Sequence, residues 1–190
     1  VSDKIGVIEN LLGKVTTLLV GGGMAYTFLK AKGFDVGKSL VEGDQIGFSL
    51  SLLERAKGKL KFLLPSDHIA AERMDAQAKR QTVKNEMVPP GWVCLDIGPE
   101  TIKAFSEEIK SGKTIVWNGP MGVFEFAPFA AGTNAIAQAL AGLTGAVTVI
   151  GGGDSVAAIT KYNLSDQVSY VSTGGGAMLE YIEGKELPGV

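Results

Sequence analysis

Five short runs rich in apolar residues recur along the chain, and the segments between them carry apolar residues at helical spacing. In the first segment these positions fall on one face of a helix that begins near Ser2; they are Ile5, Ile8, Leu11 and Leu12. The pattern therefore predicts strands that alternate with helices. We expect strands at 17–20, 61–64, 114–117, 147–150 and 168–171, and helices at about 2–12, 24–32, 44–57, 100–110, 133–143 and 178–182.

This alternation indicates parallel strands joined by right-handed helical crossovers. A sheet of that kind has helices on both faces. We therefore expect an α/β fold, a three-layer, Rossmann-like open parallel sheet of about five strands, in one domain over residues 1–190. The stretch 65–92 is polar and has no apolar stripe, so it is expected to be a long excursion over the surface.

Three runs of glycine follow predicted strands and precede predicted helices. They are Gly21 to Gly23, Gly151 to Gly153 and Gly174 to Gly176. The carboxyl ends of parallel strands share one edge of a sheet, and open α/β sheets bind ligands there. Glycine lets a ligand approach the backbone, and the first N–H groups of a helix attract phosphate. We favour a phosphate-binding edge over the alternative, in which the glycines only make tight turns and allow close packing.

Two common nucleotide signatures are missing from the sequence. It has no G-x-x-x-x-G-K-[ST] segment, and neither GGGDSVAA nor GGGAMLEY supplies the third glycine of G-x-G-x-x-G. A P-loop and an NAD-binding dehydrogenase site are therefore disfavoured.

The composition excludes several classes of function. The 190 residues carry a formal net charge of −2, which argues against nucleic acid or an anionic membrane as the main partner. No apolar run reaches the length of a membrane span. With one cysteine, Cys94, and one histidine, His68, the sequence has no His/Cys metal cluster. The lone cysteine also favours a reducing, cytoplasmic location.

Three charged residues are candidates for chemistry. Asp154 follows a glycine run at a predicted helix N-terminus, where it is either a simple cap or a carboxylate ligand for Mg²⁺ beside a phosphate. Glu125, in the aromatic stretch GVFEFAPF, is either a rim residue or an acceptor for ribose hydroxyls. Position alone does not distinguish Lys4 from a solvated surface lysine.

Seven segments, taken in their order along the chain, give the sequence a specific resemblance. They are VSDKI, LLVGGGMAYTFLK, LDIGPET, IVWNGPMGVFEF, GTNAIA, IGGGDSVAA and VSTGGGAMLEYIEGKELPGV. Together they resemble the C-terminal, nucleotide-binding half of phosphoglycerate kinases. The resemblance implies a whole enzyme of two α/β lobes, of which the N-terminal lobe holds 3-phosphoglycerate and the C-terminal lobe holds Mg-ADP or Mg-ATP. The N-terminal substrate lobe, and the strand that precedes VSDK in the family, are expected to be absent from this chain.

The resemblance assigns phosphate and metal contacts to specific residues. Lys4 matches the lysine that touches both the nucleotide phosphates and the transferred phosphoryl group. Gly152, Gly153, Asp154 and Ser155 match the helix N-terminus that receives the phosphates, with Asp154 on the Mg²⁺ ion. In the third glycine run, Gly174, Gly175 and Gly176 match backbone donors that face the phosphoryl group in flight; Lys4, Gly175 and Gly176 are thus the implied catalytic residues.

The resemblance also implies contacts to the rest of the nucleotide. The first glycine run, Gly21, Gly22 and Gly23, matches the run beside the adenine, and Leu95 is implied on the other side of the ring. Asn118 and Pro120 match residues that flank the base and phosphates. Glu125 matches the acid that binds the ribose.

The implied reaction transfers a phosphoryl group between 1,3-bisphosphoglycerate and ADP, giving 3-phosphoglycerate and ATP. The attacking oxygen of ADP is already anionic, so the reaction needs positioning and cationic or N–H donors rather than a general base. Because the substrate lobe is expected to be absent, the isolated chain is expected to bind Mg-nucleotide without turnover. The alternative is a non-catalytic module that uses the same fold to bind a nucleotide or a protein partner.

Overall fold

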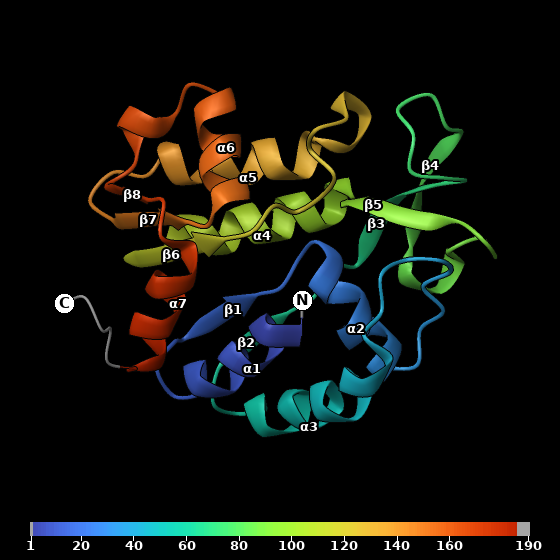
Figure 1. The fold of residues 1–190 in the computed structure, drawn as a ribbon, viewed down its shortest axis with the longest axis horizontal. Helices are drawn as coiled ribbons and strands as arrows, with labels where there is room; N and C mark the ends of the chain where they lie inside the picture. The colour runs from blue at the N-terminus through green and yellow to red at the C-terminus, as the bar shows by residue number, and fades with distance from the viewer. Residues whose placement is uncertain (1, 186–190) are drawn as a thin grey trace.

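The computed structural model describes residues 2–185 (Figure 1). Over this range the chain forms seven α-helices and eight strands. The helices are α1 (Ser2–Leu11), α2 (Gly23–Ala31), α3 (Ile46–Ala56), α4 (Pro99–Ser111), α5 (Ala131–Ala141), α6 (Gly153–Lys161) and α7 (Gly175–Glu183). The strands are β1 (Thr17–Leu19), β2 (Lys61–Leu63), β3 (Asp67–Ala71), β4 (Arg80–Lys84), β5 (Val93–Ile97), β6 (Thr114–Asn118), β7 (Val147–Gly151) and β8 (Tyr170–Ser172).

The five strands expected from the sequence are present, as β1, β2, β6, β7 and β8, and all their pairings are parallel. The α/β class with parallel sheets flanked by helices is therefore confirmed. The strands form two hydrogen-bonded ladders, β1–β2 and β6–β7–β8, instead of one continuous sheet. Within residues 2–185, β1 and β6 each have a ladder partner on one side only.

The expectation of a surface excursion over 65–92 is wrong. This stretch contains the antiparallel hairpin β3–β4, and β3 also pairs with β5 to make a three-stranded antiparallel sheet. The hydrophobic pattern does not predict β3, because its buried side chains include Ala70 and Ala71, which are only weakly hydrophobic. It does not predict β4 either, because only Val83 of that strand is buried.

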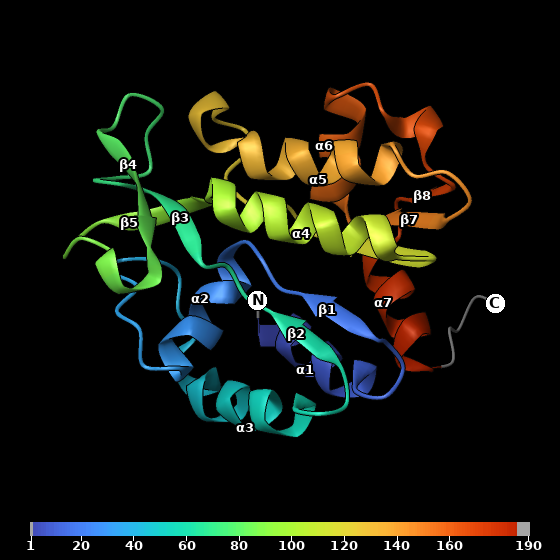
Figure 2. The ribbon, with the colours of Figure 1, turned by 180° about the vertical axis from the view of Figure 1, so that it is seen from behind.

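The two parallel ladders pack against different groups of helices, although Leu19 of β1 and Leu63 of β2 also contact the core of the β6–β8 ladder. The β6–β8 ladder packs Trp117 and Ile150 against α4, α5 and α6, through residues such as Phe105, Ile136 and Ile159. The β1–β2 ladder shares a second core with α1, α2 and α3. Figures 1 and 2 show these two groups in different parts of the molecule, with α7 descending from β8 to pack against α1. No helix within residues 2–185 combines the length and apolar character that crossing a bilayer requires.

Candidate phosphate-binding site

The second and third glycine runs meet in space. Gly152, with φ of 88°, is the N-cap residue of α6, and Gly174 is the N-cap residue of α7. A Cβ on Gly175 would overlap the backbone of Gly152, so these loops approach as closely as only glycine allows. The first run lies apart from them, where Gly22, with φ of 62°, abuts the carbonyl of Pro120. The glycines therefore allow close packing between loops, in addition to leaving the backbone free of side chains.

A small cavity of about 50 Å³ opens beside the N-terminus of α6. Six residues implicated by the sequence line it together with Gly119; they are Lys4, Asn118, Gly152, Gly153, Asp154 and Ser155. Lys4 reaches it from the first turn of α1, and a Cβ on Gly119 would lie 3.4 Å from the Lys4 Nζ. One cation and one helix N-terminus therefore face the same space, which suits an anion.

The N-terminal turns of α4 and α5 are closed by buried carboxylates, whereas that of α6 is not. Asp67 of β3 accepts hydrogen bonds from the backbone N–H groups of Glu100 (2.9 Å) and Thr101 (2.8 Å) at the start of α4. Asp96 of β5 accepts one from Gly132 (2.8 Å) at the start of α5. Within residues 2–185, no side chain accepts a hydrogen bond from the backbone N–H groups of residues 153–155. These donors of α6 are available to a ligand.

Asn118, at the end of β6, supplies a further donor. Its Nδ2 is buried and has no hydrogen-bond partner among the described residues. The atom lies 3.2 Å from where a Cβ on Gly152 would be and 3.5 Å from the same position on Gly175. A buried amide donor without an acceptor costs free energy, so its location between two glycine loops also favours a ligand that supplies acceptor oxygens.

The turn after β6 is fixed by side chains on both sides. Gly119, with φ of 100°, donates its N–H to Ser155 Oγ (2.6 Å), and its carbonyl accepts a hydrogen bond from Trp117 Nε1 (2.7 Å). Ser155 is fully buried, and its oxygen is thus already engaged by the protein. The residue orders the wall of the cavity whatever else it contacts.

The remaining predicted site residues lie outside the cavity. Leu95 is only 3% exposed and packs with Phe129 in the core of the antiparallel sheet. Glu125 is exposed, one residue after Phe124, whose carbonyl accepts a hydrogen bond from Lys161 Nζ of α6 (2.9 Å). Gly174 and Gly176 are exposed at the start of α7. The structure therefore gathers Lys4, Asn118 and residues 152–155 at one cavity, and leaves the third glycine run and the candidates for adenine and ribose outside it.

The donor set fits a magnesium ion held jointly with a ligand. Asp154 is exposed on the first turn of α6, and residues 2–185 contain no cluster of three or more His, Cys, Asp or Glu side chains that could hold a metal alone. Mg²⁺ typically takes one or two protein carboxylates and completes its shell with phosphate oxygens and water. One carboxylate beside an anion site is compatible with that mode.

Sequence reasoning missed the residues that hold this region in place. Asp96, in the apolar strand VCLDI, was passed over, although a lone carboxylate in a buried strand is a signal of a hydrogen-bonded role. Thr133 is also fully buried, and its Oγ1 accepts the N–H of Met121 (3.0 Å). Asp67, the acceptor at α4, lay in the stretch taken for a surface excursion.

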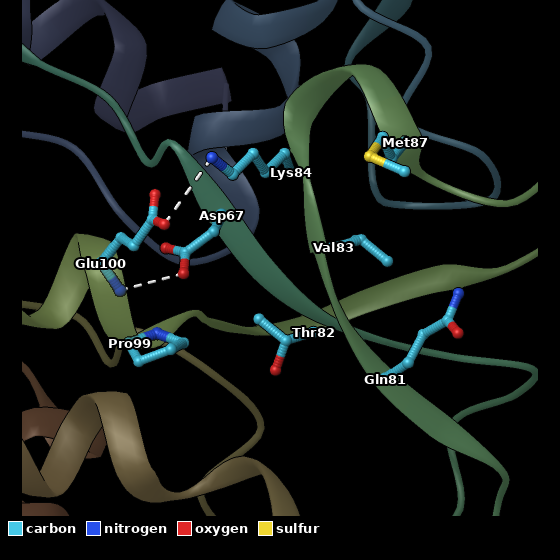
Figure 3. Close-up of a pocket in the computed structure, with 8 residues that line it drawn as sticks. All are labelled: Asp67, Gln81, Thr82, Val83, Lys84, Met87, Pro99 and Glu100. Carbon is cyan, nitrogen blue, oxygen red and sulfur yellow. Dashed lines mark hydrogen bonds and ion pairs between the residues drawn. The ribbon is translucent and has the colours of Figure 1, made fainter.

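A larger hollow of about 390 Å³ lies elsewhere, between β4 and the start of α4 (Figure 3). Lys84 Nζ lies 3.7 Å from Glu100 Oε1 across it, and both side chains are well exposed. Asp67 points from β3 toward the N–H of Glu100. None of the residues predicted to bind nucleotide lines this hollow, and its charged side chains already interact with one another or with the backbone of α4, so the smaller cavity is the better candidate.

Comparison with known proteins agrees with the resemblance noted in the sequence. A family model described as "Phosphoglycerate kinase" matches residues 1–185. The chain is 57% identical over 193 residues to a cytosolic phosphoglycerate kinase of Triticum aestivum, covering 100% of this chain and 48% of the relative. It is 56% identical over 191 residues to a phosphoglycerate kinase of Roseiflexus sp., with 48% of that protein covered. The chain thus spans about half the length of these curated relatives.

Solved structures give the same result. The phosphoglycerate kinase of Coxiella burnetii superposes with a TM-score of 0.93 at 46% identity, over 97% of this chain and 48% of that one. The enzyme of Pyrococcus horikoshii gives a TM-score of 0.83 at 34% identity, over 99% of this chain and 48% of that one. The arrangement of helices and strands described above is therefore similar to one half of those structures.

Proposed function

The chain belongs to the phosphoglycerate kinase family, and from that premise we propose that it is the part of a glycolytic kinase that binds Mg-ADP and Mg-ATP. Residues 1–190 would form the nucleotide-binding lobe, and 3-phosphoglycerate would be held by residues outside this range. We expect the chain to act in the cytoplasm, as the name of the wheat relative states for that protein.

The observation that carries the proposal is the set of donors at α6 that have no acceptor among residues 2–185. The backbone N–H groups at 153–155, the ammonium of Lys4 and the unpaired Nδ2 of Asn118 surround one cavity. Phosphate oxygens would accept from all three kinds of donor. The closed N-termini of α4 and α5 show that this fold can fill such a position with its own carboxylate. An open N-terminus beside a cation therefore favours an external anion.

Magnesium would be held between the phosphates and Asp154, and when bound it would neutralise charge on the phosphoryl oxygens. The nucleoside would lie along the neighbouring loops. Glu125 would accept hydrogen bonds from the ribose hydroxyls, and the adenine would lie between Gly21 to Gly23 and the segment that contains Leu95. Pro120, whose carbonyl abuts Gly22, would flank the base.

The proposed reaction needs no proton transfer by the protein. In the direction of ATP formation, an anionic β-phosphate oxygen of ADP attacks the phosphorus of an acyl phosphate. The new P–O bond forms as the bond to the acyl oxygen breaks, and a carboxylate leaves. Lys4 and the backbone N–H groups of Gly175 and Gly176 would stabilise the charge on the transferred group. Because alignment of two reactants can supply about 7–11 kcal/mol of a barrier, this chain alone should not turn over.

Calorimetry with ADP, with and without Mg²⁺, tests the proposal. We expect weak binding of Mg-ADP, loss of the Mg²⁺-dependent part of the affinity in Asp154→Ala, and a smaller loss in Glu125→Ala that is absent when 2′,3′-dideoxy-ADP replaces ADP. Glu100→Ala, an exposed carboxylate at the start of α4, is the matched control and should bind as wild type does. No binding at millimolar Mg-ADP, or phosphoryl transfer to 3-phosphoglycerate by this chain alone, would contradict the proposal.

A further inference from the structure

Asp96 is fully buried between the antiparallel sheet and the segment that carries several proposed nucleotide contacts. Its Oδ1 accepts the N–H of Ile97 (2.9 Å), and its Oδ2 accepts the N–H of Gly132 at the start of α5 (2.8 Å). The carboxylate thus joins β5 to the first turn of α5. Within residues 2–185, Asp96 is the one side chain that accepts a hydrogen bond from the backbone N–H of Gly132.

The loop that follows β6 packs directly against the same carboxylate. A Cβ on Gly122 would lie 2.6 Å from Asp96 Cγ and 2.7 Å from the carbonyl oxygen of Leu95, so this loop residue lies directly on Asp96. A Cβ on Gly132 would overlap Asp96 and Ile97. The N–H of Val123 donates to the Leu95 carbonyl (2.8 Å). Residues 119–132 are therefore fixed to β5 at two places.

Pro120 and Glu125 lie inside this fixed segment, and Leu95 precedes Asp96 directly. We propose that Asp96 is a positioning residue whose ionised carboxylate holds residues 119–132 in the arrangement that receives the adenosine part of the nucleotide. The inference rests on the proposed function, since it concerns the same site. Asp96 itself does not contact the ligand and acts through Gly122 and Gly132.

The ionised and protonated forms of Asp96 differ in what they can hold. The carboxylate accepts both N–H groups, whereas a proton on Oδ2 would face the N–H of Gly132, donor against donor. Burial raises the pKa of Asp96 to about 7, although its two backbone hydrogen bonds act in the opposite direction. The change between the two forms therefore falls near neutral pH.

The other titratable groups near Asp96 stay uncharged through that range. Burial raises the pKa of Tyr26 and of Tyr162, and it raises the pKa of Cys94 to about 11. His68 contacts Tyr26, and burial lowers its pKa, which favours the neutral imidazole. A change of affinity centred near pH 7 would thus report Asp96.

The test uses adenosine, which has no phosphate to titrate, and follows amide shifts of the ¹⁵N-labelled chain at pH 6, 7 and 8. If only the ionised form receives the ligand, the competent fraction rises about tenfold between pH 6 and 8, and the affinity of the wild-type chain rises equally. Asp96→Asn mimics the protonated acid, so its affinity for adenosine at pH 8 should fall by more than the tenfold range of the wild-type profile and show no pH dependence. Asp67→Asn, the same change at α4, should keep the wild-type pH profile.

Equal affinity of the wild-type chain at pH 6 and 8, or a wild-type pH profile in Asp96→Asn, would overturn the inference. If Asp96→Asn does not fold, the profiles of wild type and Asp67→Asn decide the matter alone. Binding of ADP without any binding of adenosine would overturn the role of Asp96 but leave the phosphate site intact. Failure of both ligands to bind would overturn the proposed function, and this inference with it.

Discussion

Helices α5 and α6 pack against each other, yet the first backbone N–H groups of the two helices differ in whether a side chain accepts from them. The N-terminal turn of α5 is closed by the buried Asp96, as that of α4 is closed by the buried Asp67. That of α6 begins with glycines and opens into the cavity beside Lys4. All three helices present the same backbone donors, so the donors alone do not make a binding site. What distinguishes α6 is that, within residues 2–185, no carboxylate accepts a hydrogen bond from its first backbone N–H groups.

The two carboxylates that close the N-terminal turns of α4 and α5 differ from one another as well. Asp67 accepts hydrogen bonds from two backbone N–H groups and from Thr101 Oγ1 (2.6 Å). Asp96 accepts two, both from backbone. Asp67, which accepts more hydrogen bonds, is expected to contribute mainly to stability. Asp96, whose pKa is raised to about 7, can also change its charge near neutral pH. Three changes test how far this division between structural and ligand-related helix ends holds.

The largest effect is expected at α4. Asp67→Ala should lower the free energy of unfolding by about 4 kcal/mol, because it removes the acceptor of two backbone N–H groups and the shorter of the two contacts of the Thr101 hydroxyl. Urea denaturation monitored by circular dichroism measures this. In conditions where the variant is folded, its affinity for ADP should match that of wild type. A loss of affinity in the folded variant would show that α4 is not purely structural.

The next effect is a pH dependence of stability at α5. The pKa of Asp96 is raised to about 7 in the folded chain, above the ordinary value of 3.8 that holds when the chain is unfolded, so between these values only the folded state keeps the proton. Stability therefore falls as pH rises through this window. Between pH 5 and 7 wild type should lose about 2.3 kcal/mol relative to Asp96→Asn. Parallel curves for the two proteins in urea denaturation at each pH would contradict the assignment.

The smallest effect is expected when a carboxylate is added to the open N-terminal turn of α6. Gly153→Asp places a carboxylate at the first turn of α6, where a Cβ has no atom within 4 Å. Without Mg²⁺, affinity for ADP should fall about 30-fold, equivalent to about 2 kcal/mol, because the new charge repels the phosphates. Stability should rise by about 0.5 kcal/mol through the helix dipole. Gly153→Asn is the neutral control, and equal losses in both variants would show that size, not charge, matters.

The sequence predicted the parallel part of this fold because its strands are β-branched or leucine-rich and separated by well-marked helices. It did not predict the antiparallel sheet. The strand β3 buries alanines, and β4 buries only Val83, so hydrophobic periodicity was weak in both. Their pairing depends on contacts with β5 that are distant in sequence.

The site was predictable to a similar degree. The glycine run and Asp154 are local signals of the N-terminus of α6, whereas Lys4, Asn118 and Ser155, which also line the cavity, were predicted only from the resemblance to a family. Asp67 and Asp96 were not identified, because what defines them is a hydrogen bond to a helix 33 to 36 residues further along the chain. The orphan Nδ2 of Asn118 is likewise a property of packing rather than of residue type.

The polar face that concealed β4 also bears on how this protein behaves at high concentration. Among the described residues β4 has a ladder partner on one side only, so its other edge presents backbone groups that another chain could pair with. Arg80 and Lys84, both exposed, stand at the two ends of that strand. Pairing with a second edge would strip water from these charges, and the cost opposes edge-to-edge aggregation. A strand too polar to be recognised in the sequence is, for the same reason, one that resists growth into larger assemblies.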